Sequence, residues 1–239
     1  MGKIVAIGGG ELSKGETYIL DQYIVELSHK NNPKLLFIPT ASKDALGYIT
    51  TIKEYFGELG CSVDSLCLIT NSYTDEAIRS MILDADIIYV GGGDTVRMME
   101  KWKEYNVDSY LKEAYEKGVV LSGISAGSIC WFEFGHSDSD CFINNGQWDY
   151  IRAYGLGLIT AAHCPHYNEI GRESFDNMML GEAIPGIALE NKTAFIEEDG
   201  KYKVMKADQD SRVYVLNYCN GTLQKEELHE GWVDIQFLK

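Results

Sequence analysis

The sequence has few basic residues and few prolines, and it contains no long apolar run. Of its 239 residues, 21 are Lys or Arg and 36 are Asp or Glu, which gives a net charge of −15. So acidic a chain is poorly suited to nucleic acid or an anionic membrane as its main partner. No stretch approaches the ~20 consecutive apolar residues of a membrane span, and the apolar start is too short for a secretory signal. We therefore expect a cytoplasmic protein.

Metal and cofactor signatures are missing as well. The six cysteines show no C-x-x-C spacing, which favours reduced thiols over a disulfide framework or a zinc site. His163 and His166 flank Cys164, but three-residue spacing on an extended segment puts the two imidazoles on opposite faces. Glycines 8–10 are followed by Ser13 where a dinucleotide loop needs glycine, and no glycine run ends in G-K-[ST]. We expect no metal and no cofactor.

Apolar strands alternate with amphipathic helices through the first half of the chain. This alternation predicts an α/β fold with three layers, in which helices cover both faces of a mainly parallel sheet. Short connections without a Pro- or Ser-rich linker predict a single domain over residues 1–239. Strands are expected at residues 3–7, 34–38, 62–68, 86–90, 119–122 and 157–162. Helices are expected at residues 15–31, 45–59, 74–83, 96–102, 109–117 and 128–134. After Pro185 we expect an antiparallel extension of the sheet, with strands at residues 187–189, 193–197, 202–207, 213–218 and 233–237.

The run G-I-S-A-G, residues 123–127, lies between a predicted strand and a predicted helix. In that context the pattern is typical of a nucleophile elbow, a sharp turn that lifts a serine hydroxyl out of the backbone. The helix that follows directs its N-terminus at a developing oxyanion. Ser125 is therefore a candidate nucleophile. A tight strand-to-helix turn with glycines for packing alone is the alternative interpretation.

A serine nucleophile needs a base, an orienting acid and oxyanion donors. His166 and His163 follow a predicted strand and so lie at the edge of the sheet where ligands bind. The candidate carboxylates are Asp138, Asp140, Glu169 and Glu190. The Ala126 amide and the glycine turn at residues 92–93 are the candidate oxyanion donors, because glycine lets backbone N–H groups approach a ligand closely.

Four segments together carry a family resemblance: residues 91–95 (G-G-G-D-T), 123–127 (G-I-S-A-G), 164–168 (C-P-H-Y-N) and 186–194 (G-I-A-L-E-N-K-T-A). In this order they resemble the serine peptidase family of aspartyl dipeptidase (peptidase E) and cyanophycinase. The resemblance implies one α/β domain related to the class I glutamine amidotransferase fold, with a flavodoxin-like sheet. It also implies a cytoplasmic, metal-free hydrolase of short peptides, which we expect to be a monomer or a homodimer.

Residue roles follow from the same resemblance. It implies Ser125 as nucleophile, His166 as base, and Glu190 ahead of Asp140 as the acid. It further implies oxyanion or substrate-binding roles for Gly92, Gly93, Asp94 and Ala126. Recognition of an N-terminal aspartate needs a cation, yet no Arg or Lys lies between Ser125 and Arg152. The preferred peptide is therefore left open.

Two other hypotheses remain open at this stage. An α/β-hydrolase esterase would use Ser125, Asp208 or Asp210, and His229 in that chain order. A non-catalytic protein that binds a small ligand in the same cleft would keep the fold without the chemistry. Amide transfer, as in the related amidotransferases, would call for cysteine in place of Ser125.

Overall fold

The computed structural model describes residues 2–144 and 147–235. The strands are β1 (Lys3–Ile7), β2 (Lys34–Ile38), β3 (Ser62–Ser65), β4 (Ile87–Val90), β5 (Val120–Ile124), β6 (Phe132–Ser137), β7 (Ile151–Tyr154), β8 (Ile159–Cys164), β9 (Gly186–Leu189), β10 (Thr193–Glu198), β11 (Lys201–Lys206), β12 (Val213–Cys219), β13 (Thr222–Leu228) and β14 (Gly231–Val233). The α-helices are α1 (Tyr18–Leu27), α2 (Leu46–Glu58), α3 (Asp75–Leu83), α4 (Thr95–Glu104), α5 (Val107–Glu116), α6 (Ala126–Ile129) and α7 (Phe175–Met178). The 3₁₀ helices are η1 (Leu12–Lys14), η2 (Thr40–Ser42), η3 (Ser139–Phe142) and η4 (Arg172–Ser174).

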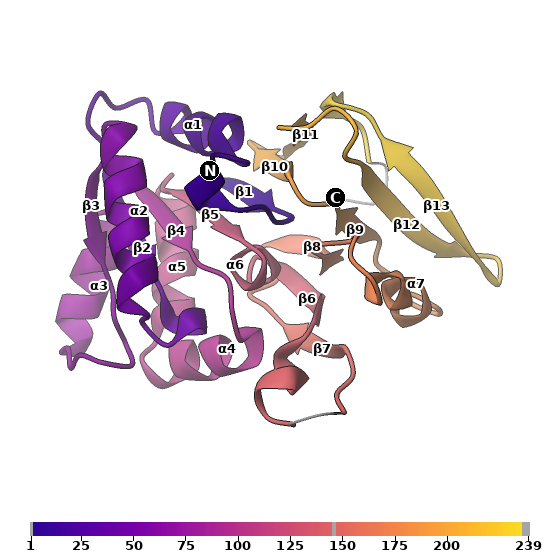
Figure 1. Cartoon of the computed structure of the whole chain (residues 1–239), viewed down its shortest axis with the longest axis horizontal. Coiled ribbons are helices and arrows are strands. Elements are labelled where there is room, and N and C mark those ends of the chain that lie inside the picture. Colours follow the sequence, from indigo (N-terminus) through magenta and orange to yellow (C-terminus); the bar gives the residue numbers. More distant parts are fainter. Residues whose placement is uncertain (1, 145–146, 236–239) are drawn as a thin grey trace.

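The larger sheet has eight strands in the order β14-β11-β10-β1-β5-β4-β2-β3 (Figure 1). Strands β1, β5, β4, β2 and β3 run parallel, whereas β10, β11 and β14 continue the sheet in antiparallel fashion. This arrangement confirms the predicted α/β fold with a mostly parallel core and antiparallel C-terminal strands.

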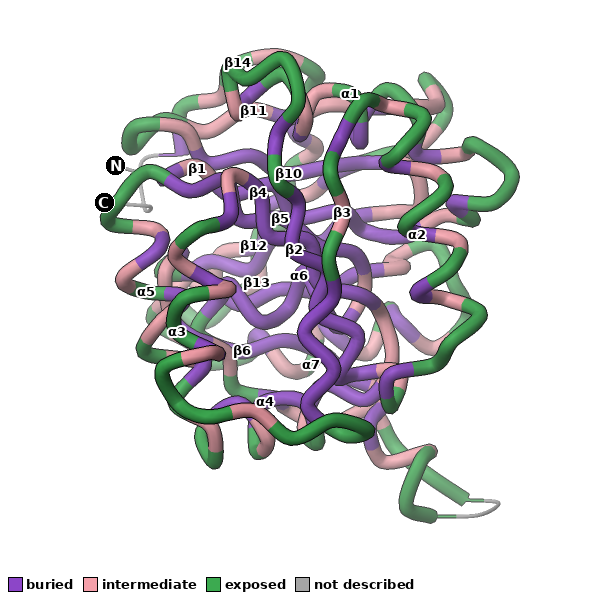
Figure 2. The backbone as a smooth tube through the Cα atoms, turned by 90° about the vertical axis from the view of Figure 1, so that its left-hand side faces the viewer, coloured by how far each residue is buried: buried purple, intermediate pink, exposed green. Residues whose placement is uncertain are grey.

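Helices cover both faces of the parallel strands. Side chains alternate along β1, so that Val5 joins the cluster beneath α1 and α2 while Ile4 joins the cluster beneath α3, α4 and α5. Ile24, on α1, and Leu111, on α5, are fully buried in these two clusters. Figure 2 shows the result as a purple band of buried strands between helices whose outer sides are exposed. No helix in residues 2–144 and 147–235 is long and apolar enough to cross a membrane.

A second sheet, of six strands, was not predicted. Its order is β13-β12-β9-β8-β6-β7. The helix expected at residues 128–134 is wrong, because α6 ends at Ile129 and the chain then enters β6. Along β6, Phe132 and Phe134 are buried and Glu133 is exposed, a period of two that belongs to a strand. His136 consequently lies on β6 and not at a helix end.

The C-terminal part of the chain forms short strands, as expected, but with several differences. Strands β9 to β12 lie at the predicted residues, but only β10 and β11 extend the first sheet as expected, whereas β9 and β12 belong to the second sheet. Strands β7 and β13 were missed. The missed strand β13 has mostly exposed polar side chains, which carry little periodic apolar signal. The strand expected at residues 233–237 is β14, which ends at Val233, and residues 236–237 lie outside the described part.

The two sheets meet where the chain passes from β9 to β10. These strands are separated by residues 190–192 only, yet β9 belongs to the six-stranded sheet and β10 pairs with β1 in the other. The Gly8 amide donates to Thr193 O at 2.9 Å, and the Lys192 amide donates to Gly9 O at 2.8 Å. The carboxyl ends of β1 and β9 are thereby held side by side, and the candidate site forms at this junction.

A buried carboxylate, Asp21, connects α1 to α2. Asp21 is fully buried, and its Oδ2 accepts hydrogen bonds from Thr17 Oγ1 at 2.7 Å and Tyr55 Oη at 2.9 Å. Its Oδ1 is buried and has no hydrogen-bond partner among residues 2–144 and 147–235. Burial raises the pKa of Asp21 from 3.8 to about 7, against the opposing effect of these two donors. The folded protein therefore binds this proton more tightly than the unfolded chain does.

We expect Asp21→Asn to flatten the dependence of stability on pH. Between about pH 4 and pH 7 the wild type has the protonated carboxyl only in the folded state, so its free energy of unfolding falls as pH rises. The fall relative to the variant is at most about 1.4 kcal/mol per pH unit. Urea unfolding at pH 5 and pH 8 measures it, with Glu54→Gln on the exposed side of α2 as control. Parallel curves for wild type and Asp21→Asn would contradict the assignment.

Candidate active site

Ser125 occupies the sharp turn between β5 and α6. Its backbone is strained, with φ 59° and ψ −118°, a region that residues with a side chain rarely adopt. The two flanking glycines are required by close contact, because a Cβ on Gly123 would collide with Gly127 O and a Cβ on Gly127 would collide with Val90 O. Ser125 is partly exposed while residues 120–124 and 126–129 are buried. The turn has the geometry expected of a nucleophile elbow.

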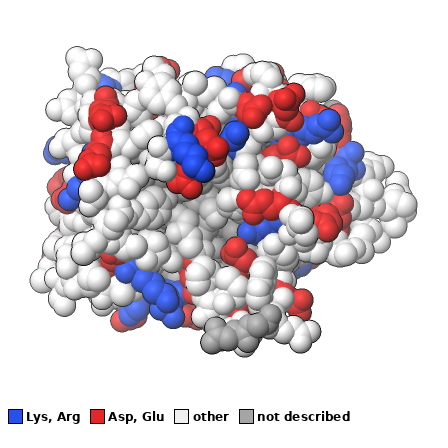
Figure 3. All heavy atoms as spheres, viewed as in Figure 1, with Lys and Arg blue, Asp and Glu red and all other residues white. Residues whose placement is uncertain are grey.

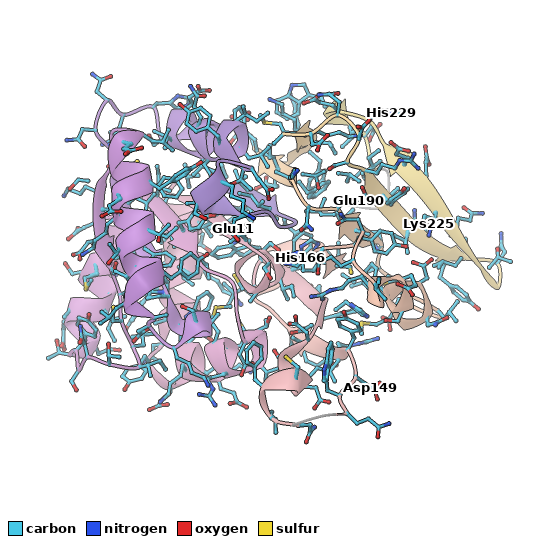
Figure 4. All side chains as sticks on the ribbon, viewed as in Figure 1. Glu11, Asp149, His166, Glu190, Lys225 and His229 are labelled. Atoms are coloured by element: carbon cyan, nitrogen blue, oxygen red, sulfur yellow. The ribbon has the colours of Figure 1, made fainter. Side chains whose placement is uncertain are left out.

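His166 follows β8 and shares its anchor with Ser125. The Ser125 amide donates to Ile7 O at 3.2 Å, and the His166 amide donates to Gly8 O at 2.9 Å. His166 also has a left-handed backbone, with φ 55°. Two strained non-glycine residues therefore attach to consecutive carbonyls at the end of β1. Figure 3 shows a hollow near the middle of this face, in the region where Figure 4 places His166.

The imidazole of His166 contacts the Asn191 amide and Glu169, one of the four candidate carboxylates, and not Glu190 or Asp140, the two that the resemblance favours. Its Nδ1 lies 2.7 Å from Asn191 Oδ1 and 3.1 Å from Glu169 Oε1, and Asn191 Nδ2 donates to Glu169 Oε1 at 3.0 Å. A carboxylate only accepts hydrogen bonds, so the amide nitrogen must face Glu169 and the amide oxygen must face the imidazole. Nδ1 is then the protonated nitrogen, and Nε2 is left as the basic one.

Neither Glu190 nor Asp140 has a hydrogen bond to His166 within residues 2–144 and 147–235. Glu190 Oε2 accepts the Arg212 amide at 2.8 Å. Asp140 accepts Asn144 Nδ2 at 2.6 Å and the Asp149 amide at 3.1 Å. Figure 4 shows Asp149 on the lower loop, well away from His166. In this structure Glu190 therefore binds the connection that leads into β12, and Asp140 binds its own loop.

The glycine turn after β4 lies directly beside the nucleophile. A Cβ on Gly92 would lie 3.3 Å from Ser125 Cβ. Gly93 has φ 137°, and its Cβ would collide with Ala41 O. Asp94 is buried and begins α4 by accepting the Arg97 amide at 3.2 Å, which is a helix-capping contact. Ala126 is the first residue of α6. Gly92 and Ala126 thus flank Ser125, whereas Asp94 shapes the turn.

A network of buried hydrogen bonds connects the elbow to the second sheet. Ser128 Oγ lies 2.8 Å from His163 Nε2 and 2.7 Å from Ser125 O, and His163 Nδ1 lies 2.9 Å from Ile187 O. Burial lowers the pKa of His163 to about 3, so the ring is neutral. Its one proton then belongs on Nδ1, facing the carbonyl of Ile187, and the single hydroxyl proton of Ser128 is shared between two acceptors, His163 Nε2 and Ser125 O. His163 is a structural support of the elbow.

The structure gives no support to a metal site in the part of the chain that it describes. No group of three or more His, Cys, Asp or Glu side chains there is arranged to hold an ion. His163 faces the elbow and His166 faces Asn191, so the two imidazoles do not converge. Cys164 is fully buried, and desolvation raises the pKa of its thiol well above the ordinary range.

Asn191 is the site residue that the sequence interpretation missed. It follows Glu190 directly, within the same G-I-A-L-E-N-K-T-A segment that carried the resemblance. The backbone amide of Asn191 also donates to Asn168 Oδ1 at 2.9 Å, which connects the β9–β10 turn to the loop that bears His166. The close approach of Gly9 is a second signal, since a Cβ there would collide with both Asn191 Oδ1 and His166 Nδ1.

Comparison with known proteins decides the family. The profile of peptidase family S51 matches residues 4–205, a span that contains Ser125, His166 and Asn191. The chain belongs to peptidase family S51. It is a serine peptidase of the peptidase E-like kind, which confirms the predicted resemblance and the predicted enzyme class.

Relatives within and around the S51 family agree with this placement. The chain is 40% identical over 169 residues to the uncharacterized peptidase YgaJ of Bacillus subtilis (strain 168), covering 70% of each chain. It is 32% identical over 111 residues to peptidase E of Shewanella denitrificans, covering 45% of this chain and 43% of that one.

Two solved structures share the fold. A peptidase from an acI-B1 Actinobacterium has a TM-score of 0.68 at 18% identity and covers 95% of this chain and 97% of its own. A putative peptidase E from Listeria monocytogenes EGD-e has a TM-score of 0.65 at 19% identity, covering 86% and 98%. At such low identity these two likenesses bear on the fold alone.

Proposed function

We propose that this S51 peptidase hydrolyses short peptides with Ser125 as nucleophile and His166 as general base. The observation that carries the proposal is the geometry around His166. Its backbone amide and that of Ser125 bind the consecutive carbonyls of Ile7 and Gly8 at the end of β1. Its Nδ1 is occupied by Asn191 Oδ1, so that Nε2 is the nitrogen available to a serine hydroxyl. This division of the two nitrogens is what a base in a serine peptidase requires.

The chemistry then follows in two stages. Ser125 Oγ bonds to the scissile carbonyl carbon while its proton passes to His166 Nε2, and the same proton goes to the amine as the carbon–nitrogen bond breaks. Water then attacks the acyl-enzyme while His166 Nε2 takes its proton, and this proton passes to Ser125 Oγ as the ester bond breaks. The amides of Gly92 and Ala126 flank Ser125 and are proposed to bind the oxyanion of the tetrahedral intermediates.

We assign the orienting role to Asn191. An asparagine can fix the tautomer and the orientation of a catalytic imidazole, as it does in Cys-His-Asn peptidases. The resemblance gives this role to Glu190 and, second, to Asp140, but their carboxylates are bound to Arg212 N and to Asn144 and Asp149 N. Glu190→Gln and Asp140→Asn are therefore expected to stay within about tenfold of wild-type kcat/KM, the size of a minor rearrangement.

Substrate preference is proposed from the cations that are already engaged. Arg152 Nη2 donates to Glu182 at 2.6 Å, and the buried Arg172 donates to His136 O at 2.9 Å and to Asp138 at 3.1 Å. Each guanidinium already pairs with a carboxylate of this chain, so neither offers an uncompensated charge to the side chain of an N-terminal aspartate. Trp131 and Phe132 are fully buried and do not line a substrate pocket. We propose short peptides with an uncharged residue before the scissile bond.

Cleavage of a dipeptide library, followed by mass spectrometry, tests the proposal. Wild type and His229→Ala are expected to cleave the same peptides, whereas Ser125→Ala and His166→Ala cleave none. His229 is exposed and lies far from His166 in Figure 4, so it serves as the matched histidine control. Loss of activity in His229→Ala with retention in His166→Ala would establish the esterase-like arrangement instead. A wild type that cleaves nothing would favour the ligand-binding alternative.

A further inference from the structure

Glu169 is the charged member of the network around His166. It lies three residues after His166 in a turn closed by the Glu169 amide and His166 O at 2.8 Å. Its Oε1 lies 3.1 Å from His166 Nδ1 and accepts Asn191 Nδ2 at 3.0 Å. One carboxylate oxygen therefore touches the imidazole and also fixes the amide that orients it.

An asparagine as orienting residue leaves the positive charge that His166 acquires during the reaction without a counter-charge. During the reaction His166 becomes an imidazolium, and in a Ser-His-Asp triad the carboxylate stabilises that positive charge. The amide of Asn191 is neutral, so it orients the ring without compensating the charge. A nearby carboxylate could compensate it from outside the usual third position.

The other charges on the His166 loop and on β8 do not compete for this role. The Arg172 guanidinium is bound to Asp138 Oδ2 at 3.1 Å. His163, on β8, is neutral because burial lowers its pKa to about 3. The pKa of Glu169 is lowered to about 2, chiefly by its hydrogen bond with His166. The carboxylate is thus ionised throughout the working range of a peptidase.

Charges on the β9–β10 connection are engaged elsewhere. Glu190 accepts the Arg212 amide, and the Lys192 ammonium lies 3.8 Å from Glu16 and 3.5 Å from Asp208. Gly9, in the turn after β1, approaches the imidazole with its backbone, because a Cβ there would collide with His166 Nδ1. Among the described residues, Glu169 is the carboxylate in contact with His166.

We propose that Glu169 is a positioning residue that supplies, from outside the Ser125–His166–Asn191 triad, the negative charge that stabilises the imidazolium of His166. The inference rests on the proposed function, because it assigns a partner to the same base. Its effect is moderated by water, since the Glu169 side chain is 51% exposed against 19% for His166. We therefore expect a shift of about one pH unit, at the lower end for an adjacent opposite charge.

The test combines an NMR titration of the His166 ring with pH profiles of hydrolysis of the best dipeptide. The His166 signal is assigned as the one missing from His166→Ala. In Glu169→Gln the titration midpoint and the acidic limb of kcat/KM are expected to fall by about one pH unit, while kcat falls about tenfold and KM is unchanged. Removal of a negative charge destabilises the protonated ring, so the midpoint must move to lower pH.

Two further variants separate charge from packing. Glu173→Gln removes another carboxylate from the same segment. The Glu173 carboxylate accepts the Gly171 amide and not the imidazole, so the His166 titration midpoint in this variant should match that of wild type. Glu169→Gln combined with Asn191→Asp moves the negative charge from residue 169 to residue 191, the other residue in contact with His166 Nδ1. This double variant should restore the His166 titration midpoint. Loss of activity in Glu169→Gln at every pH with an unmoved midpoint would overturn the inference.

Failure of the proposed function would look different. If Ser125→Ala or His166→Ala still hydrolysed the peptide, the catalytic assignment would fail whatever the titration showed. If those variants were inactive while the Glu169→Gln midpoint stayed at the wild-type value, only the role of Glu169 would be refuted.

Discussion

Ser125→Ala is expected to lower kcat by at least about 10⁴-fold, as removal of a serine nucleophile does in other peptidases. The substitution removes Oγ alone. The contacts that hold the turn belong to the backbone, namely the Ser125 amide to Ile7 O and the Ser128 and Ile129 amides to Ser125 O. Stability should therefore change by less than about 1 kcal/mol. Steady-state kinetics and urea unfolding measure the two quantities.

Ser128→Ala is the matched control for this prediction. It also removes one hydroxyl from the elbow, but a buried one that binds His163. Leaving His163 Nε2 without its donor is expected to cost about 1–3 kcal/mol of stability, with a much smaller loss of kcat than in Ser125→Ala. If Ser128→Ala lost activity as completely as Ser125→Ala while remaining folded, the identity of the nucleophile would be in question.

Gly9→Ala is expected to lower kcat by about 10²-fold, the cost of displacing a catalytic group by about 1 Å. The new methyl group would occupy the space of Asn191 Oδ1 and His166 Nδ1. Those side chains can move aside, so the protein should fold, but the imidazole would leave its position relative to Ser125. KM is expected to change little because Gly9 lies behind the ring.

Gly47→Ala provides the control for the glycine substitution. Gly47 lies in α2, and a Cβ there would meet nothing within 4 Å. The variant should keep wild-type kcat and gain a few tenths of a kcal/mol of stability, because alanine loses less conformational freedom than glycine in a helix. Wild-type kcat in Gly9→Ala would show that the His166–Asn191 contact has no part in catalysis.

Local sequence rules worked best where the conformation of a segment depends mainly on residues within that segment. Strand β4 is apolar throughout and β1 and β2 are apolar after their first residue, α3 is capped by Thr74, whose Oγ1 accepts the Ala77 amide, and the glycines around Ser125 are required by contact. Each feature depends on neighbours within a few residues or on a sheet buried on both faces. They could be predicted for that reason.

The same rules failed at residues 128–134 because short apolar runs suit a helix and a buried strand equally well. Once α6 had turned, pairing of β6 with β8 and β7 decided the matter. The paired residues lie well apart along the chain, as Ser137 with Ile151 and Phe134 with Ala162 illustrate. Local propensity does not contain such pairings.

The sequence by itself determined the elbow, the parallel core, the family and the two residues proposed to do the chemistry. Only the tertiary structure decided what orients His166. Glu190 and Asn191 are adjacent in the turn between β9 and β10, where Lys192 has a left-handed backbone with φ 66°. The passage of the chain from one sheet to the other after β9 turns Asn191 toward the imidazole and Glu190 toward Arg212. That choice depends on how two sheets meet, which no local pattern specifies.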